Sequence, residues 1–334
     1  MSRIAILGGG SWGTGLAVLL ARSRRKHEIR LWAREQEVAQ NIQEQRVNSS
    51  YLPGIAIPGY VQASDDLACV LQDAQIVVGV VPSEHAREVY LKAAPWVSRD
   101  APIVSATKGL EPATHSRMSQ VIQQAFALHF IPQVAVLSGP SFALEAARGD
   151  PTAVVLASRD RALASFLQEE FAGPTFRLYT NDDVLGVELA GAMKNVIAIA
   201  AGACQGLGLG ANSLAALITR GLAEMTRLTV AMGARPETLS GLAGLGDLVL
   251  TCHGALSRNR HVGFELGRGR SLQEILGEMK MVAEGVGTTE ALLGLARQHS
   301  IELPIIEQVH SILHLGNPPS EAIRAIMERP LRRE

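Results

Sequence analysis

The sequence predicts an α/β fold in its first half and an all-helical fold in its second. Up to about Asp182, short β-rich runs alternate with amphipathic or alanine-rich segments, the pattern of a parallel sheet with crossover helices. Beyond that residue the β-rich runs stop and helical periodicity takes over. A chain of 334 residues is also too long for one small core. We therefore predict two domains, residues 1–182 and residues 183–334.

The candidate strands are short apolar runs, several of them apolar throughout rather than alternating. Such runs are expected where helices cover both faces of a doubly wound sheet. The segment Tyr51–Tyr60, which holds Pro-Gly twice, is expected to be a loop. Asn181 and Asp182 are the expected N-cap residues of a long helix that begins near Val184. The candidate strands are Ile4–Leu7, Glu28–Trp32, Ile76–Val81, Pro102–Ala106, Val134–Leu137 and Ala153–Ala157.

Composition is that of an ordinary globular protein, with 47% hydrophobic and 19% charged residues. The net charge of -1 gives no overall attraction to nucleic acid or to an anionic membrane, so an anionic ligand needs local basic groups. The three cysteines, Cys69, Cys204 and Cys252, lie far apart, which favours a reducing, cytoplasmic location. We interpret the basic turn Arg22–Lys26 as solvated surface rather than a binding patch.

The uncharged stretch Ile4–Ala21 has a signal peptide or membrane anchor as its alternative interpretation. Several glycines interrupt it, and each costs about 1 kcal/mol in a helix. A glycine-rich turn between a strand and a helix explains the same residues better, and no other long uncharged apolar segment is expected to span a membrane.

A Gly-x-Gly-x-x-Gly pattern, Gly8–Gly13, lies directly between the first predicted strand and the following helix. In such a turn Gly8 permits the tight bend, Gly10 lets the backbone approach a pyrophosphate, and Gly13 packs helix against strand. The N-terminus of the helix then presents unpaired N–H groups to the anion. The alternative is a glycine-rich turn without a ligand.

The end of the second predicted strand bears on the choice between NAD and NADP. An acidic residue is expected there when the ribose 2′-hydroxyl of NAD is bound. Here Trp32 is followed by Ala33 and Arg34, and Arg34 suits a 2′-phosphate. NADP(H) is therefore favoured over NAD(H), with a solvated arginine beside Glu35 as the alternative.

Ligands of open parallel sheets bind at the carboxyl ends of the strands, so the residues after each strand are candidates. Besides the glycine turn these are Pro82-Ser83, Thr107–Gly109 and Ser138–Ser141, which are small, polar or cationic. Lys108 follows a strand that looks buried, which places its ammonium at that edge of the sheet. An incidental surface lysine is the alternative.

The segment Val184–Cys204 contains only two ionisable residues, Glu188 and Lys194, which lie about 120° apart around a helix. A lysine in an apolar helix needs a reason, because burial of an ammonium is costly and tends to lower its pKa. Such a lysine suits proton transfer to or from a hydroxyl as hydride moves at the same carbon. A buried lysine–carboxylate ion pair is the alternative.

Downstream, Ser257–Arg260 places guanidinium groups beside short polar side chains, a combination that suits a phosphate. Gly244–Asp247 precedes it. His310 and His314 are four residues apart, but no zinc motif accompanies them, so we expect no metal site.

Together these stretches resemble the bacterial-type NAD(P)-dependent glycerol-3-phosphate dehydrogenase family, from about Ile4 to beyond Leu313. The turn Arg22–Lys26 is longer and more basic than the turn usual in the family. The resemblance rests on Gly8–Gly13, Thr107–Gly109, Ser138–Ala143, Lys194-Asn195, Gly244–Asp247, Ser257–Asn259 and Val282–Gly285, which occur in this order.

The resemblance implies an N-terminal Rossmann domain and a C-terminal helical domain with substrate between them. It implies reduction of dihydroxyacetone phosphate to glycerol 3-phosphate for phospholipid synthesis, with Lys194 as proton donor and Asp247 orienting it; we also expect a homodimer. The implied substrate contacts are Lys108, Gly139, Ser141, Lys194, Asp247, Ser257, Arg258 and Asn259. The implied cofactor contacts, besides Gly8, Gly10 and Gly13, are Ser11, Trp12, Arg34, Lys108, Ala143, Arg258, Val282 and Glu284.

Two alternatives of other kinds stay open at this point. One is a related two-domain dehydrogenase that acts on a hydroxy-carboxylate instead of a phosphate ester. The other is a nucleotide-binding regulatory module without catalysis, which would have no need of a lysine in an apolar helix.

Overall fold

The computed structural model describes residues 2–279 and 281–331, and the chain divides into two compact units. The first unit runs to Glu111 and resumes from Ser116 to Glu188. The second contains Pro112–His115 and the chain from Leu189 onward. The division therefore lies inside one long helix, a few residues past the predicted boundary at residue 182.

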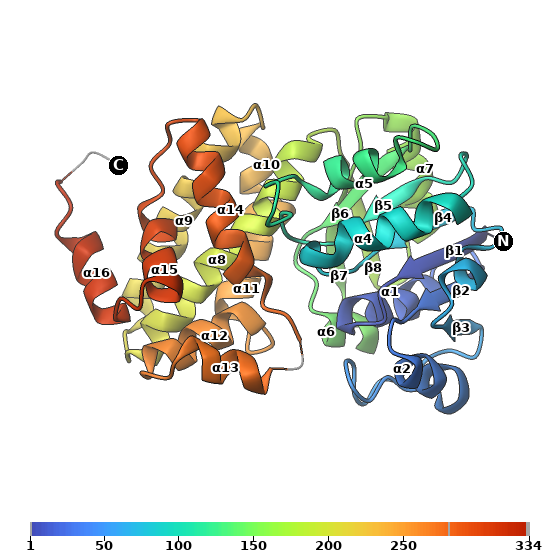
Figure 1. The fold of residues 1–334 in the computed structure, drawn as a ribbon, viewed down its shortest axis with the longest axis horizontal. Coiled ribbons are helices and arrows are strands. Elements are labelled where there is room, and N and C mark those ends of the chain that lie inside the picture. Colours follow the sequence, from blue (N-terminus) through green and yellow to red (C-terminus); the bar gives the residue numbers. More distant parts are fainter. Residues whose placement is uncertain (1, 280, 332–334) are drawn as a thin grey trace. The chain divides into compact units, whose positions relative to one another are not determined.

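An eight-stranded sheet forms the centre of the first unit, in the order β3-β2-β1-β4-β5-β6-β7-β8 (Figure 1). All neighbouring strands are parallel except β6 and β7, which are antiparallel. The strand order reverses between β1 and β4, the point at which doubly wound sheets bind ligands. The strands are β1 Ser2–Leu7, β2 His27–Trp32, β3 Val61–Ser64, β4 Ile76–Gly79, β5 Ile103–Ser105, β6 Val134–Ser138, β7 Thr152–Ala157 and β8 Phe176–Asn181.

Every predicted strand is present, but β3 and β8 were not predicted. β3 has only four residues and carries one fully buried side chain, Val61, so its apolar signal is weak. β8 lies at the far edge of the sheet, and its side chains are alternately buried and exposed. Its residues, Phe-Arg-Leu-Tyr-Thr-Asn, therefore form no apolar run. The sheet is mostly parallel, as predicted, and the exception is the antiparallel pairing of β6 with β7. The segment Tyr51–Tyr60 contains turns and neither strand nor helix, as predicted.

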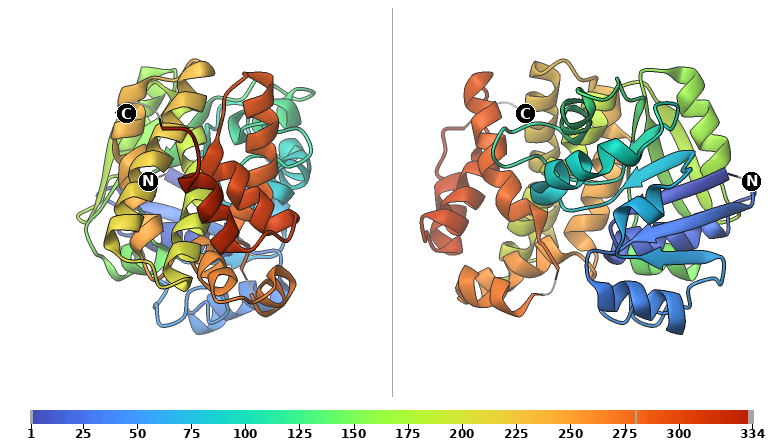
Figure 2. Two further views of the ribbon diagram at one scale, coloured as in Figure 1. Left: turned by 90° about the vertical axis from the view of Figure 1, so that its left-hand side faces the viewer. Right: turned by 45° about the vertical axis from the view of Figure 1, so that its right-hand side comes forward.

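Helices cover both faces of the sheet, which explains why its central strands are apolar throughout (Figure 2). One face is packed by α1 (Ser11–Ala21), α6 (Ala143–Arg148) and α7 (Arg161–Phe171). The other is packed by α3 (Leu67–Leu71), α4 (Ser83–Ala93) and α5 (Met118–Phe126). Short helical segments complete this unit: α2 Gln36–Gln40, η1 Asn41–Gln45 and η2 Ala94–Trp96.

The second unit is built from helices, with no strand among its described residues. Its core is α8 (Val184–Gly206), which is buried on every side from Leu189 to Ile199, as expected of a helix that is apolar all round. The other elements are α9 Ala211–Ala231, α10 Pro236–Ser240, the π-helix η3 Leu242–Gly246, α11 Asp247–His253, α12 Arg258–Gly267, α13 Leu272–Glu278, α14 Glu284–Gln298, α15 Pro304–His314 and α16 Pro319–Met327.

Helix α8 begins at Val184, as predicted, but its cap differs from the expected one. Asp183 rather than Asn181 or Asp182 is the cap, because its Oδ1 accepts the N–H of Gly186 at 2.9 Å. Asn181 lies two residues before this cap, and its Oδ1 accepts the N–H of Asp183 at 2.8 Å. The carboxylate thus satisfies a donor that the first turn of a helix leaves unpaired.

Among the described residues, α8 is the one helix long and apolar enough to cross a membrane, a property that the sequence analysis had not assigned to it. In its most apolar window of 18 residues, 89% are buried inside the protein, which is what the core helix of a folded unit shows. The stretch Ile4–Ala21 forms a strand, a turn and a helix, which excludes a single membrane helix there.

The basic turn after α1 is exposed but not simply solvated, so that interpretation needs correction. Arg22 donates to the carbonyl oxygen of Ala147 on α6 at 2.7 Å. Arg25 forms ion pairs with Glu169 at 2.8 Å and Glu170 at 2.5 Å, both on α7. The turn therefore ties together the helices of one face of the sheet.

Glu224 of α9 is a carboxylate buried in the second unit, with 3% of its surface exposed. It accepts the N–H groups of Ile305 at 2.8 Å and Ile306 at 3.4 Å, in the first turn of α15. Burial nevertheless raises its pKa to about 7. The folded chain therefore holds a proton between about pH 4.5 and 7 that the unfolded chain releases.

We predict that the free energy of unfolding falls as the pH rises through this window, by about 3 kcal/mol from Glu224 alone. Glu224→Gln is neutral at every pH, so its unfolding free energy in urea at pH 5, 6, 7 and 8 should lack this decline. The exposed Glu237→Gln on α10 is the matched control and should keep the wild-type slope. Equal slopes in the wild type and Glu224→Gln would contradict the assignment.

Candidate functional site

The glycine turn after β1 has the backbone geometry that its sequence predicts. Gly8 has a φ of +129°, and a Cβ there would lie 2.9 Å from the carbonyl oxygen of Val80. A Cβ on Gly13 would lie 1.8 Å from the carbonyl oxygen of Gly8, so α1 packs directly on the turn. A Cβ on Gly10 would meet nothing within 4 Å, so protein packing does not require a glycine there. Open space at Gly10 fits the close approach of a ligand.

The N-terminus of α1 has the features of an anion site. Its N-cap is Gly10, and no side chain caps the helix. The N–H groups of this turn and the positive end of the helix dipole are a suitable anion site. Trp12 lies in the same turn, and its Nε1 is buried without a hydrogen-bond partner in the described part of the chain.

Two residues that support this turn were missed by the sequence analysis. Asn48 is 1% exposed, and its Nδ2 donates to the carbonyl oxygen of Gly9 and to Thr14 Oγ1, both at 2.8 Å. The carbonyl oxygen of Tyr51 accepts a hydrogen bond from Ser11 Oγ at 2.6 Å. No local pattern marks these residues, because the contacts join positions about 40 residues apart.

Arg34 lies just after β2, where the predicted 2′-phosphate contact requires it. Its side chain is 69% exposed, and Nη2 pairs with Glu35 Oε1 at 2.9 Å. The hydroxyl of Tyr51 lies 3.5 Å from the same Glu35 oxygen. An exposed ion pair of this kind contributes only about 0–1 kcal/mol, so Glu35 binds the guanidinium weakly.

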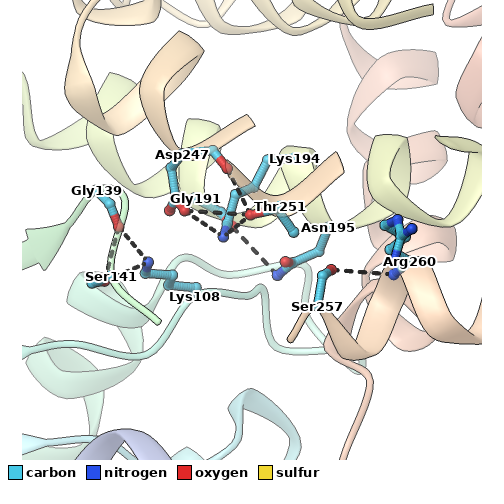
Figure 3. A network of polar contacts seen from close by, with 10 residues as sticks. All are labelled: Lys108, Gly139, Ser141, Gly191, Lys194, Asn195, Asp247, Thr251, Ser257 and Arg260. Atoms are coloured by element: carbon cyan, nitrogen blue, oxygen red, sulfur yellow. Dashed lines mark hydrogen bonds and ion pairs between the residues drawn. The ribbon is translucent and has the colours of Figure 1, made fainter. Parts of the chain in front are cut away.

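Residues from the ends of β5 and β6 meet around the amine of Lys108, as the sequence predicts. Lys108 Nζ donates to the carbonyl oxygen of Gly139 at 2.7 Å and to Ser141 Oγ at 3.2 Å (Figure 3). Gly139 has a φ of +135°, and a Cβ there would lie 3.0 Å from Val154 Cα. Ala143 begins α6 beside α1, with its carbonyl oxygen 3.2 Å from the Cβ position of Gly15.

In the second unit, Lys194 is buried with its amine between two acceptors on α11. Lys194 is 5% exposed and Asp247 is 1% exposed. Lys194 Nζ lies 2.7 Å from Asp247 Oδ1 and 2.7 Å from Thr251 Oγ1 (Figure 3). Thr251 donates its own hydroxyl proton to the carbonyl oxygen of Asp247 at 2.6 Å, so its lone pairs face the ammonium. A buried ammonium is thus matched by a buried carboxylate.

The π-helix η3 places Asp247 at the start of α11. A Cβ on Gly244, inside η3, would lie 2.0 Å from the carbonyl oxygen of Leu239 on α10, so this backbone contact requires glycine. Asp247 follows the wider turn directly. Single π-turns of this kind are frequent at functional sites.

Glu188, the other ionisable residue of the apolar helix, belongs to a separate cluster in the first unit. It forms an ion pair with Arg117, and its Oε1 accepts the N–H of Ser119 at 2.7 Å. Its second oxygen accepts the Ser119 hydroxyl at 2.7 Å. The carboxylate partner of Lys194 is therefore Asp247 and not Glu188, in agreement with their separation around the helix.

The predicted phosphate residues lie in the first turn of α12. Ser257 is the N-cap, and its Oγ accepts the N–H of Arg260 at 3.2 Å. Arg258 Nη1 donates to the carbonyl oxygen of Val282 at 2.7 Å, which brings two predicted cofactor contacts together. Asn259 is 8% exposed, and its Oδ1 accepts the N–H of Gly285 at 2.9 Å. Glu284 begins α14 beside them.

Two family models match the chain, one for each half. The model described as NAD-dependent glycerol-3-phosphate dehydrogenase N-terminus matches residues 3–164. The model described as NAD-dependent glycerol-3-phosphate dehydrogenase C-terminus matches residues 183–324. Together they span most of the chain, and the second match begins next to the start of α8.

Relatives and solved structures agree with these models. The chain is 56% identical over 331 residues to a glycerol-3-phosphate dehydrogenase [NAD(P)+] of Koribacter versatilis, covering 99% of this chain and 98% of that protein. A protein of the same description from Acidobacterium capsulatum is 53% identical, with 100% of both chains covered. The crystal structure of glycerol-3-phosphate dehydrogenase from Coxiella burnetii matches with a TM-score of 0.93 at 43% identity, covering 98% of this chain and 99% of that chain.

Proposed function

The chain belongs to the NAD-dependent glycerol-3-phosphate dehydrogenase family, and we propose that Lys194 transfers the proton in its reaction. The enzyme interconverts dihydroxyacetone phosphate and sn-glycerol 3-phosphate with NAD(P) as cofactor. The observation that carries the assignment of Lys194 is its burial against Asp247. A dehydrogenase needs one group that gives a proton to the carbonyl oxygen, and this amine is held ready for it.

In the direction of reduction, a bound nicotinamide supplies hydride to C2 of the substrate. Lys194 donates a proton from its ammonium to the C2 oxygen. The neutral amine that remains takes up a new proton at Nζ before the next turnover. Asp247 holds the ammonium in place through their ion pair. Thr251 fixes the direction of the amine through a second contact on the same helix.

The phosphate of the substrate is assigned to the guanidinium and amide donors at the start of α12. Arg258 and Asn259 lie in the first turn of α12, where N–H groups and the helix dipole add to the attraction. Asn259 Nδ2 has no partner among residues 2–279 and 281–331 and is a donor for a phosphate oxygen. Lys108, with Gly139 and Ser141, is assigned to the substrate by the family resemblance, and these three residues contact one another in the first unit.

The glycine turn and Arg34 are assigned to the cofactor. Gly8, Gly10 and Gly13 shape the turn for the pyrophosphate, and Arg34 favours NADPH over NADH through the 2′-phosphate. The remaining assignments rest on the family resemblance and on position in the fold. Ser11, Trp12 and Ala143 lie around α1, and Ser257, Val282 and Glu284 lie around α12. A homodimer, a cytoplasmic location and a role in phospholipid synthesis also follow from the family and stay predictions.

We predict a strong preference for the phosphorylated substrate. Reduction of dihydroxyacetone phosphate should exceed that of dihydroxyacetone in kcat/KM by about 10³-fold or more, because a site with buried polar groups rejects an analogue that leaves them unpaired. The measurement is NADPH absorbance with each ketone. Equal kcat/KM for the two, or higher activity on a keto-carboxylate, would contradict the phosphate site and favour a hydroxyacid dehydrogenase.

Arg34→Ala should weaken NADPH selectively. Loss of a charged hydrogen bond to the 2′-phosphate should raise KM for NADPH about 10- to 100-fold and leave KM for NADH nearly unchanged. Steady-state kinetics with both cofactors measures this. Arg99→Ala, an exposed arginine in the turn between η2 and β5, is the matched control and should alter neither constant. A parallel rise in both constants would show that Arg34 does not discriminate.

A further inference from the structure

Gly285, near the start of α14, is in close contact with Asn259, Thr289 and Asn195. Its N–H donates to Asn259 Oδ1 at 2.9 Å, and its carbonyl oxygen accepts the Thr289 hydroxyl at 2.5 Å. A Cβ added to Gly285 would lie 2.8 Å from the carbonyl oxygen of Asn195 and 2.8 Å from Asn259 Oδ1. The φ of Gly285 is not positive, so close packing rather than backbone conformation requires glycine here.

The contact of Gly285 with Asn195 and Asn259 joins α14 to α8 and α12, next to the assigned residues of those two helices. Asn195 follows Lys194 on α8, and Asn259 follows Arg258 on α12. Gly285 packs against both, at a place where a side chain would separate α14 from α8 and α12. A real carbon–oxygen contact of about 3.3 Å or more would require a displacement of roughly 0.5 Å.

The packing of α8 on α12 gives this junction little freedom to adjust. A Cβ on Gly263 would lie 1.9 Å from the carbonyl oxygen of Ile199. Gly263 lies one turn after Asn259 on α12, and Ile199 lies one turn after Asn195 on α8. A Cβ on Gly267 would lie 2.5 Å from the carbonyl oxygen of Ala203, one further turn along. The two helices therefore run in the same direction with their backbones in contact, in one register. A displacement at Gly285 has to be taken up by Asn259 or by α14 itself.

The hydrogen bond from Gly285 also selects the orientation of the Asn259 amide. A backbone N–H is a donor, so the atom facing it is the carbonyl oxygen of the asparagine side chain. The amino group, Nδ2, then points the other way and is the donor that a phosphate oxygen needs. With the amide turned over, the phosphate would meet a carbonyl oxygen instead.

We propose that Gly285 is a positioning residue for substrate selection: it presents the Nδ2 of Asn259 to the phosphate by binding the Oδ1 of the same side chain. This inference rests on the proposed function of Asn259. It assigns to Gly285 an effect on the phosphorylated substrate that a general packing role would not have.

The test is the ratio of kcat/KM for dihydroxyacetone phosphate to that for dihydroxyacetone in Gly285→Ala. Displacement of Asn259 should lower kcat/KM for the phosphorylated ketone about 10- to 100-fold and leave that for dihydroxyacetone nearly unchanged, so the ratio shrinks by the same factor. Gly287→Ala is the matched control on the same helix, because its Cβ would meet only Pro112 Cγ at 3.9 Å. It should keep the wild-type ratio.

Asn259→Asp provides a second variant in case Gly285→Ala does not fold. It keeps an oxygen for the Gly285 N–H but has no donor for the phosphate, so the same ratio should collapse while thermal stability stays near that of the wild type. A wild-type ratio near one would contradict the proposed function itself. A large wild-type ratio that survives in folded Gly285→Ala would overturn the positioning role alone, and one that survives in Asn259→Asp would overturn the phosphate contact of Asn259 on which that role rests.

Discussion

An ammonium group buried in an apolar helical unit needs a negative partner, and Lys194 finds one in Asp247. Removing one member of such a pair costs about 3–5 kcal/mol, because the other is left buried and unpaired. Two hydrophobic residues would serve stability as well or better. We therefore propose a catalytic reason for the pair, since an amine donates a proton only in its ammonium form and Asp247 holds that form in one direction.

Close backbone contacts hold both ends of this chemistry in place. In the first unit Gly13 packs against Gly8, which places α1 directly after the turn and directs the first N–H groups of the helix toward the end of β1. In the second, Gly244 permits the π-turn that delivers Asp247, and Gly263 lets α12 lie directly on α8. Glycine serves at each of these places because a β-carbon would occupy the space of a neighbouring backbone atom.

Sequence reasoning succeeded where the signal was local or chemical. A few adjacent residues were enough to predict the glycine turn, the start of α8 at Val184 and the isolated lysine in an apolar helix. Prediction failed for β8, whose alternating pattern follows from its edge position, and for Asn48, whose partners are distant in the sequence. The carboxylate facing Lys194 was suggested by family resemblance, because a contact across 53 residues leaves no local signal.

The most direct test of the account is the turnover of Lys194→Ala, measured together with NADPH binding by fluorescence. Loss of the proton donor should lower kcat for dihydroxyacetone phosphate about 10²- to 10⁴-fold, with NADPH bound nearly as tightly as in the wild type. Added methylamine, a small proton donor of the same kind, should restore part of the rate. Turnover close to that of the wild type, in a variant that folds and binds NADPH, would contradict the role given to this amine.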